Sequence, residues 1–246
     1  MLLLRRSRST PGSLARRIAI VLRWPLGLAL VSWRYMWRTT PVHRSEADGD
    51  ASDLPPAIPP DLLDDDVQPV EDGVGPLFHR HYSVRVEGTQ QEPAEVIAAF
   101  AGEPNSGAPS EVAVFVKSRG EPGSLSVGDE FLIRMPGPWD GPVRVIDRTD
   151  TSFRLATLRG HLEAGQIEFS CRPDGDRLFI GIEAWARSGD RLSHLLYSGV
   201  GVAKEIQLNL WVETCLRLAA GTGGRARGGV EAHTRRLPEP FPPPEE

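Results

Sequence analysis

Residues 166–187 read QIEFSCRPDGDRLFIGIEAWAR, and this stretch carries the strongest structural signal of the chain. Two runs of alternating apolar residues flank Asp174-Gly175, a dipeptide typical of a two-residue type I′ turn. A hairpin closed by this turn places facing apolar residues on one side, namely Cys171 with Leu178, Phe169 with Ile180, and Ile167 with Ile182. A slip of one residue would mix the two faces, so the sequence specifies which side is the core side. Farther along that side Ala184 and Ala186 replace the large residues, which predicts room at one end of the sheet.

Similar patterns extend from this hairpin in both directions. Residues 78–87 alternate as a half-buried strand does, and residues 91–102 have helical spacing. Further short alternating runs, separated by Pro, Gly and Asp, lie at 111–119, 127–135, 141–147 and 152–158. These segments predict an antiparallel meander.

A long helix is predicted over residues 202–220. Val202, Ile206 and Leu210 recur at helical spacing, and Gly221 is a plausible stop. The order of a strand, a helix, six antiparallel strands and a long last helix resembles the helix-grip fold of the START/Bet v 1-like superfamily. That resemblance implies an α+β domain over residues 76–220. In this fold a curved sheet wraps the long C-terminal helix, and an apolar cavity lies between the sheet and the helix. The implied cavity residues are Ile167, Phe169, Leu178, Ile180, Ile182, Ala184, Ala186, Ile206 and Leu210.

A sharper resemblance lies in residues 157–169, TLRGHLEAGQIEF, preceded by GPVRVI at 141–146. This motif resembles the domain-of-unknown-function family nineteen-ninety, which occurs in actinobacteria and plants and has no established activity. Arg159 and Leu162 stand where that family usually has prolines. The resemblance does not extend to residues 1–70.

Two interpretations of His161 and Glu163 stay open. A histidine titrates near neutral pH and a carboxylate can orient it, so the two residues could form a catalytic proton-transfer pair at the mouth of the cavity. Alternatively the segment is a shaped turn, in which Gly160 and Gly165 supply unusual dihedral angles and His161 bonds the backbone.

The charge of −5 is unevenly distributed along the chain. Residues 1–44 contain nine arginines and no acidic residue, whereas residues 45–75 contain ten acidic residues and no lysine or arginine. Within the basic arm, residues 14–38 form an apolar segment with a cationic stripe, which favours a helix lying in an anionic membrane interface. The expected membrane-binding residues are Arg16, Arg23, Trp24, Trp33, Arg34, Trp37 and Arg38. A spanning helix and a helix packed on the folded domain are the alternatives, and Arg23 argues against a signal peptide.

The acidic, proline-rich segment 45–75 is predicted to be an extended or disordered linker, and residues 221–246 a disordered tail. The two cysteines exclude a disulfide scaffold, and His79 and His81 share a strand face without a third ligand, so no metal and no cofactor are expected. The acidic domain and the absence of a phosphate-binding loop argue against nucleic acid as a partner.

These features favour a non-enzymatic binding module for an apolar small molecule or lipid, held on the cytoplasmic side of a membrane as a peripheral or single-pass protein. A cyclase- or hydrolase-like enzyme using His161 and Glu163, and a membrane-tethered scaffold without a ligand, are the alternatives.

Overall fold

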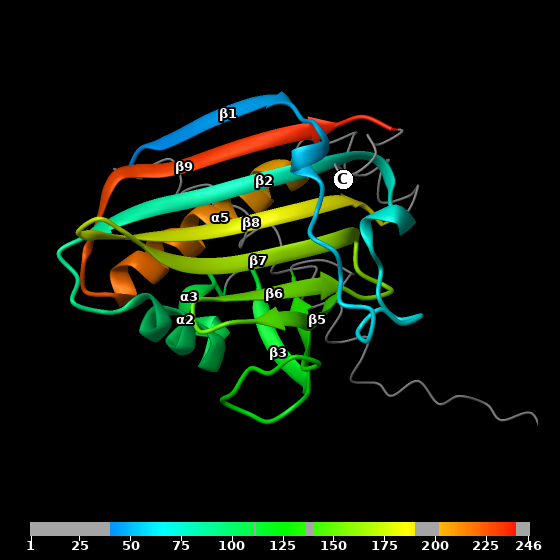
Figure 1. Cartoon of the computed structure of the whole chain (residues 1–246), viewed down its shortest axis with the longest axis horizontal. Coiled ribbons are helices and arrows are strands. Elements are labelled where there is room, and N and C mark those ends of the chain that lie inside the picture. The colour runs from blue at the N-terminus through cyan, green and yellow to red at the C-terminus, as the bar shows by residue number, and fades with distance from the viewer. Residues whose placement is uncertain (1–39, 111, 136–139, 190–201, 240–246) are drawn as a thin grey trace, which may run out of the picture.

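The computed structural model describes residues 40–110, 112–135, 140–189 and 202–239 as an α+β fold built on one curved sheet (Figure 1). Its strands are β1 (Val42–Asp48), β2 (Val74–Glu87), β3 (Val114–Arg119), β4 (Glu130–Arg134), β5 (Asp140–Arg148), β6 (Ser152–Thr157), β7 (Glu163–Asp174), β8 (Arg177–Ser188) and β9 (Arg225–Leu237). They lie in the order β1-β9-β2-β8-β7-β6-β5-β4-β3, and within this described sheet only β1 and β9 are parallel. The helices are α2 (Pro93–Gly102), α3 (Pro104–Gly107) and α5 (Val202–Gly221), with short 3-10 turns η1 (Ala51–Asp53) and η2 (Val70–Asp72). The predicted α+β class is therefore confirmed.

Alternation along the strands gives the sheet two different faces. The face that α5 packs against, the inner face, carries Tyr82 of β2, Phe169 of β7 and Ile182 of β8, each at most 3% exposed. The opposite, outer face carries the polar residues of the same strands, including His79 and Glu183. Burying the apolar set against α5 and α2 forms the main core.

The β7–β8 hairpin forms, but its pairs are shifted from the predicted ones. Phe169 faces Ile182 and Asp174 faces Arg177, so the turn is centred on Gly175 and Asp176. A type I′ turn at Asp174-Gly175 would need a positive φ at both residues, whereas among the described residues only glycines have one, and Gly175 is at 66°. The glycine therefore takes the first central position of a type II′ turn. Because the shift is by two residues in the pairing, each side chain keeps its predicted face.

The long helix is present, but it is not the last element. α5 spans 20 residues, close to the predicted range, and lies behind β2, β8 and β9 in Figure 1. Leu210 is buried, as predicted, yet Val212 and Cys215 are buried still more completely at 0% exposed. The side chain of Ile206 lies outside the described part of the chain. α5 is thus covered on more sides than the predicted apolar stripe implies.

The predicted disordered tail contains strand β9, which is a correction. β9 pairs with β2 on one side and with β1 on the other, so these two strands extend the sheet beyond the predicted meander. Two glycines interrupt the regular pairing of β9 with β2. Gly228 and Gly229 have φ of 76° and 94°, and the register between the two strands shifts at this point. A glycine pair is suited to such a bulge because only glycine adopts these angles freely.

The acidic segment 45–75 is described along its whole length, which agrees with the extended form of the predicted linker and not with a disordered one. After β1, residues 49–72, which we call the strap, cross the outer face from β2 toward β5 (Figure 1). Val67 makes an isolated bridge with Leu158, and Ile58 and Leu62 pack on a small apolar cluster beneath. The acidic residues stay on the strap surface or pair with cations, which explains how a charged segment can dock.

The membrane-binding segment of the basic arm stays a prediction. Residues 14–38, with Arg16, Arg23, Trp24, Trp33, Arg34, Trp37 and Arg38, lie outside the described residues. Within the described ranges, no helix is both long enough and apolar enough to cross a membrane.

Candidate functional site

The residues predicted to line a cavity lie on the inner face, as the alternation indicated. Seven of the predicted cavity residues are buried, with at most 8% of their surface exposed: Phe169, Leu178, Ile180, Ile182, Ala184, Ala186 and Leu210. Ile167 is half-buried and packs against the same core. Whether these residues enclose a cavity stays a prediction.

Side-chain size changes along this face. In the middle, Phe169 contacts Phe100, Phe153 and Trp211, with ring centroids 5.0–5.7 Å apart. This aromatic cluster fills the space between sheet and helices. Toward the far end of β8, the small residues Ala184 and Ala186 lie beside Arg80 and Phe78 of β2, respectively.

Arg80 is the unexpected residue of the inner face. It alternates in phase with Tyr82 on β2, between Ala184 of β8 and Thr234 of β9, and only 5% of its surface is exposed. Its guanidinium lies over the ring of Phe78, with Cζ 4.7 Å from the centroid. Its Nη1 is buried and has no hydrogen-bond partner.

Polar groups from three elements gather near this arginine. Tyr82 is 3% exposed, and burial raises its pKa to about 12; the charge of Arg80 lowers that pKa and the charge of Glu163 raises it. The carboxylate of Glu163, at the start of β7, accepts hydrogen bonds from Nε2 of Gln207 on α5, at 3.0 and 3.3 Å. The side chain of Glu163 therefore points toward α5.

Three residues of α5 also have buried polar atoms without a hydrogen-bond partner, namely Oε1 of Gln207, Oδ1 of Asn209 and Nε1 of Trp211. Gln207 and Trp211 lie one helical turn apart. Most buried polar atoms in proteins are hydrogen-bonded, so exceptions require an explanation such as a ligand site. Arg80 on β2 and Gln207 and Trp211 on α5 are therefore candidate polar residues of a site with an apolar wall, the composition typical of small-molecule sites.

His161 is held by the backbone. Its Nδ1 lies 2.9 Å from the N–H and 3.1 Å from the carbonyl oxygen of Glu163, so this nitrogen has a partner in either tautomer. Its ring lies against Gly141, where an added Cβ would come within 2.9 Å. Burial lowers the pKa of His161, an effect that the charge of Glu163 partly offsets.

This geometry agrees with a shaped turn. Gly160 has φ of 95°, and a side chain at Gly165 would collide with the carbonyl of Trp185. His161 thus contacts the backbone of Glu163, while the carboxylate of Glu163 turns to Gln207. The chain brings the two residues close together but directs their polar atoms to different partners.

On the outer face, a histidine joins the strap to the sheet. His79 Nδ1 lies 2.8 Å from Asp53 of the strap, and Nε2 lies 2.7 Å from Glu183 of β8. The ring stacks on Trp185 with centroids 5.0 Å apart. Burial disfavours the charged ring, but the hydrogen bonds and charges of Glu183 and Asp53 together raise the pKa of His79. Among the described residues, no group of three or more His, Cys, Asp or Glu side chains is arranged to hold a metal.

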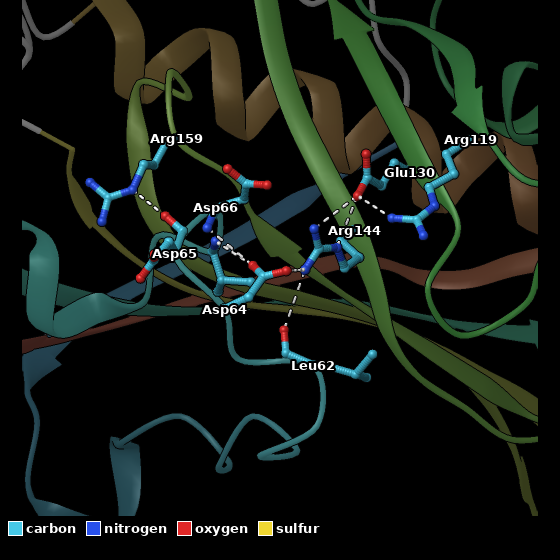
Figure 2. Close-up of polar contacts among 9 residues, drawn as sticks. Leu62, Asp64, Asp65, Asp66, Arg119, Glu130, Arg144 and Arg159 are labelled. Carbon is cyan, nitrogen blue, oxygen red and sulfur yellow. Dashed lines mark hydrogen bonds and ion pairs between the residues drawn. The ribbon is translucent and has the colours of Figure 1, made fainter.

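A second contact fastens the acidic run of the strap, as Figure 2 shows. Arg144 of β5 donates through Nη1 to Asp64, at 2.7 Å, and through Nε and Nη2 to Glu130 of β4, at 3.0 and 2.9 Å. Arg159 donates to the backbone carbonyl of Asp65. These polar contacts of the outer face therefore hold the strap against the sheet.

Sequence reasoning missed Arg80, Tyr82 and Gln207 as site residues. A signal was present: Arg80 occupies an apolar-side position of β2, in phase with Tyr82, Val84 and Val86. A charged residue in that phase departs from the alternation and identifies a candidate site residue.

Residues 78–211 match the model of a family described as Domain of unknown function (DUF1990). None of the curated proteins matches the chain. Among solved structures, the KanY protein is 13% identical with a TM-score of 0.43, covering 62% of this chain and 99% of that chain. The di-domain ARO/CYC StfQ of the steffimycin biosynthetic pathway is 14% identical with a TM-score of 0.44, covering 62% of this chain and 51% of that one. A point mutant of norcoclaurine synthase from Thalictrum flavum is 12% identical with a TM-score of 0.40, covering 60% and 98%. These values leave the function open.

Proposed function

The chain belongs to the DUF1990 family, and we propose that its domain binds a small molecule with an apolar body between the inner face of the sheet and α5. The observation that carries this proposal is the group of buried polar atoms without partners on Arg80, Gln207 and Trp211. Leaving a buried polar group unpaired costs about 1–3 kcal/mol, so three such groups on facing elements favour a bound molecule that pairs them.

The place of the ligand follows from side-chain size. Phe169 and Trp211 fill the middle of the inner face, whereas β8 carries only the small side chains of Ala184 and Ala186 at the end near Arg80. We place the ligand at this end, with its apolar body against the aromatic cluster. Burial raises the pKa of the Cys215 thiol on α5 to about 12. The thiol is therefore un-ionised and does not act as a nucleophile.

The first test is native mass spectrometry of the full chain, purified gently from a lipid-containing host. The full chain is required because β9 is an integral strand of the sheet and ends at Leu237. An added mass that is lost on denaturation supports the proposal and identifies the ligand class. A bare mass, with no uptake from a mixture of lipids and isoprenoids, contradicts it.

The second test fills the site. Ala184→Trp is expected to abolish uptake while the domain still folds, because the indole would occupy ligand space. The matched control is Ala156→Trp, since Ala156 is 0% exposed on the outer face beneath the strap. Overpacking there costs about 1–3 kcal/mol or more, so the control loses stability. Equal destabilisation by both substitutions would show that Ala184 has no free space above it.

Attachment to a membrane surface through residues 14–38 is part of the same proposal. Arg23→Glu together with Arg34→Glu should release the full chain from vesicles that contain anionic lipid. Continued sedimentation with these vesicles would favour a spanning helix instead.

A further inference from the structure

Arg80 has no charged partner among the described residues, although it is as deeply buried as Arg144, which has two. The described chain contains four arginines below 9% exposure, and three of them have protein acceptors. Arg144 bonds Glu130 and Asp64, Arg154 bonds Asp147, and Arg187 bonds the carbonyls of Val70 and Gly75. For Arg80, no hydrogen bond or ion pair to a described residue is found, and its Nη1 is sealed from solvent.

The surroundings of Arg80 do not supply the missing charge. A guanidinium stays protonated in proteins, so it cannot escape the cost of burial by losing a proton. The ring of Phe78 beneath it contributes about 0.5–2 kcal/mol, whereas an uncompensated buried ion costs several kcal/mol. Glu163, whose charge acts on the Tyr82 phenol as that of Arg80 does, accepts a hydrogen bond from the Gln207 amide.

We propose that Arg80 receives the anionic group, a carboxylate or a phosphate monoester, of the ligand that occupies the inner face. A guanidinium presents a planar set of donors that matches the oxygens of either group. The indole N–H of Trp211 is a further buried donor without a partner, one that suits an oxygen atom of the same ligand. This inference rests on the proposed function, and it names the substrate class as amphipathic anions.

Calorimetric titration of the full chain tests this with matched probes. The probes are dodecanoate, dodecyl phosphate and methyl dodecanoate, together with acetate and inorganic phosphate as head groups without a tail. We expect at least one long-chain anion to bind about tenfold to a hundredfold more tightly than the methyl ester, and the short anions to bind much more weakly.

The variants assign the effect to Arg80. Arg80→Met should remove the preference for the anion and leave the affinity for the methyl ester unchanged. Arg85→Met is the control, because Arg85 lies on the same strand but on the outer face, where Asp174 and Glu231 already pair it. It should bind all probes as the unsubstituted chain does.

The outcomes separate this inference from the proposed function. Equal affinity of the unsubstituted chain for dodecanoate, dodecyl phosphate and methyl dodecanoate would overturn the role of Arg80 and leave the binding site standing. Binding of acetate or inorganic phosphate as tight as that of the long-chain anions would identify a free-anion site and overturn the amphipathic class. Failure of every probe to bind would overturn both proposals. An independent readout is the unfolding midpoint without ligand, which Arg80→Met should raise or leave unchanged. A large fall would show that Arg80 is a structural residue and would overturn the inference.

Discussion

Arg144 on the outer face and Arg80 on the inner face are both 5% exposed, yet their surroundings differ completely. Arg144 donates to two carboxylates and anchors the strap, whereas Arg80 lies over the ring of Phe78 and has no acceptor among the described residues. Removing one partner of a buried ion pair is strongly destabilising, and a buried charge without a partner destabilises the folded protein. The cation of the outer face therefore has a structural role, and we propose that the cation of the inner face meets a ligand.

The largest expected effect concerns Arg144. Arg144→Met should lower the free energy of unfolding by about 2–3 kcal/mol, because the partly buried Glu130 loses its buried cation and keeps only the exposed Arg119. Denaturant unfolding followed by circular dichroism measures this. Arg80→Met is the matched comparison, and equal losses in the two variants would abolish the distinction between the faces.

The next effect concerns the pH dependence of the His79 contact. Because the pKa of His79 is raised in the folded protein, the contact contributes fully to the free energy of unfolding below about pH 6.5, the pKa of histidine in the unfolded chain. This contribution is lost as the pH rises through the raised pKa. The hydrogen bond from His79 lowers the pKa of Glu183. Glu183 therefore contributes fully to the free energy of unfolding above about pH 4.5, the pKa of glutamate in the unfolded chain, and this contribution is lost as the pH falls through the lowered pKa. The stability difference between the unsubstituted chain and His79→Gln should therefore be greatest between pH 4.5 and 6.5, at about 1–2 kcal/mol.

Unfolding curves from pH 4 to pH 9 for both proteins check this. A difference that grows above pH 6.5 would mean that His79 acts as a neutral ring and that the strap is held in another way.

The smallest effect concerns His161, and it has the opposite sign. Burial lowers the pKa of His161 in the folded protein. Its neutral ring therefore contributes fully to the free energy of unfolding above about pH 6.5, the pKa of histidine in the unfolded chain, and this contribution is lost as the pH falls through the lowered pKa. His161→Asn retains a side chain that can bond the backbone of Glu163, so it should cost under about 1 kcal/mol at pH 8 and less at acid pH. Paired unfolding curves at the two pH values measure the difference.

This variant also addresses catalysis. The hypothesis of a His161–Glu163 proton-transfer pair predicts that any turnover disappears in His161→Asn. The shaped-turn interpretation predicts that ligand uptake by this variant is unchanged. Uptake that fails while folding is intact would return His161 to the candidate site.

Strand alternation alone predicted much of the sheet. Residues 78–87 and 166–187 gave the strands β2, β7 and β8 and the face of each side chain, because a period of two follows from backbone geometry. The exact pairing of the hairpin was wrong, because the turn type depends on which residue takes a positive φ, and here only Gly175 does so. A shift of two residues changes partners but not faces, so the core was still identified correctly.

β1 and β9 could not be found in this way. Val230 and Ala232 are the main apolar residues that β9 turns inward, too few for a periodic signal, and β1 is mostly exposed. Their pairing joins residues more than 180 positions apart, as in Val42 with Val230. Such strands are stabilised by the edge of an existing sheet, so local sequence does not reveal them.

The sequence by itself determined that this chain is an α+β protein of the DUF1990 family and that Arg80 stands in an apolar phase of its strand. Only the tertiary structure decided what each charge meets. It brought Asp53 to His79 and Asp64 to Arg144, and it gave Arg80 no anionic partner within the described part of the chain, because partners distant in sequence are determined by packing and not by spacing.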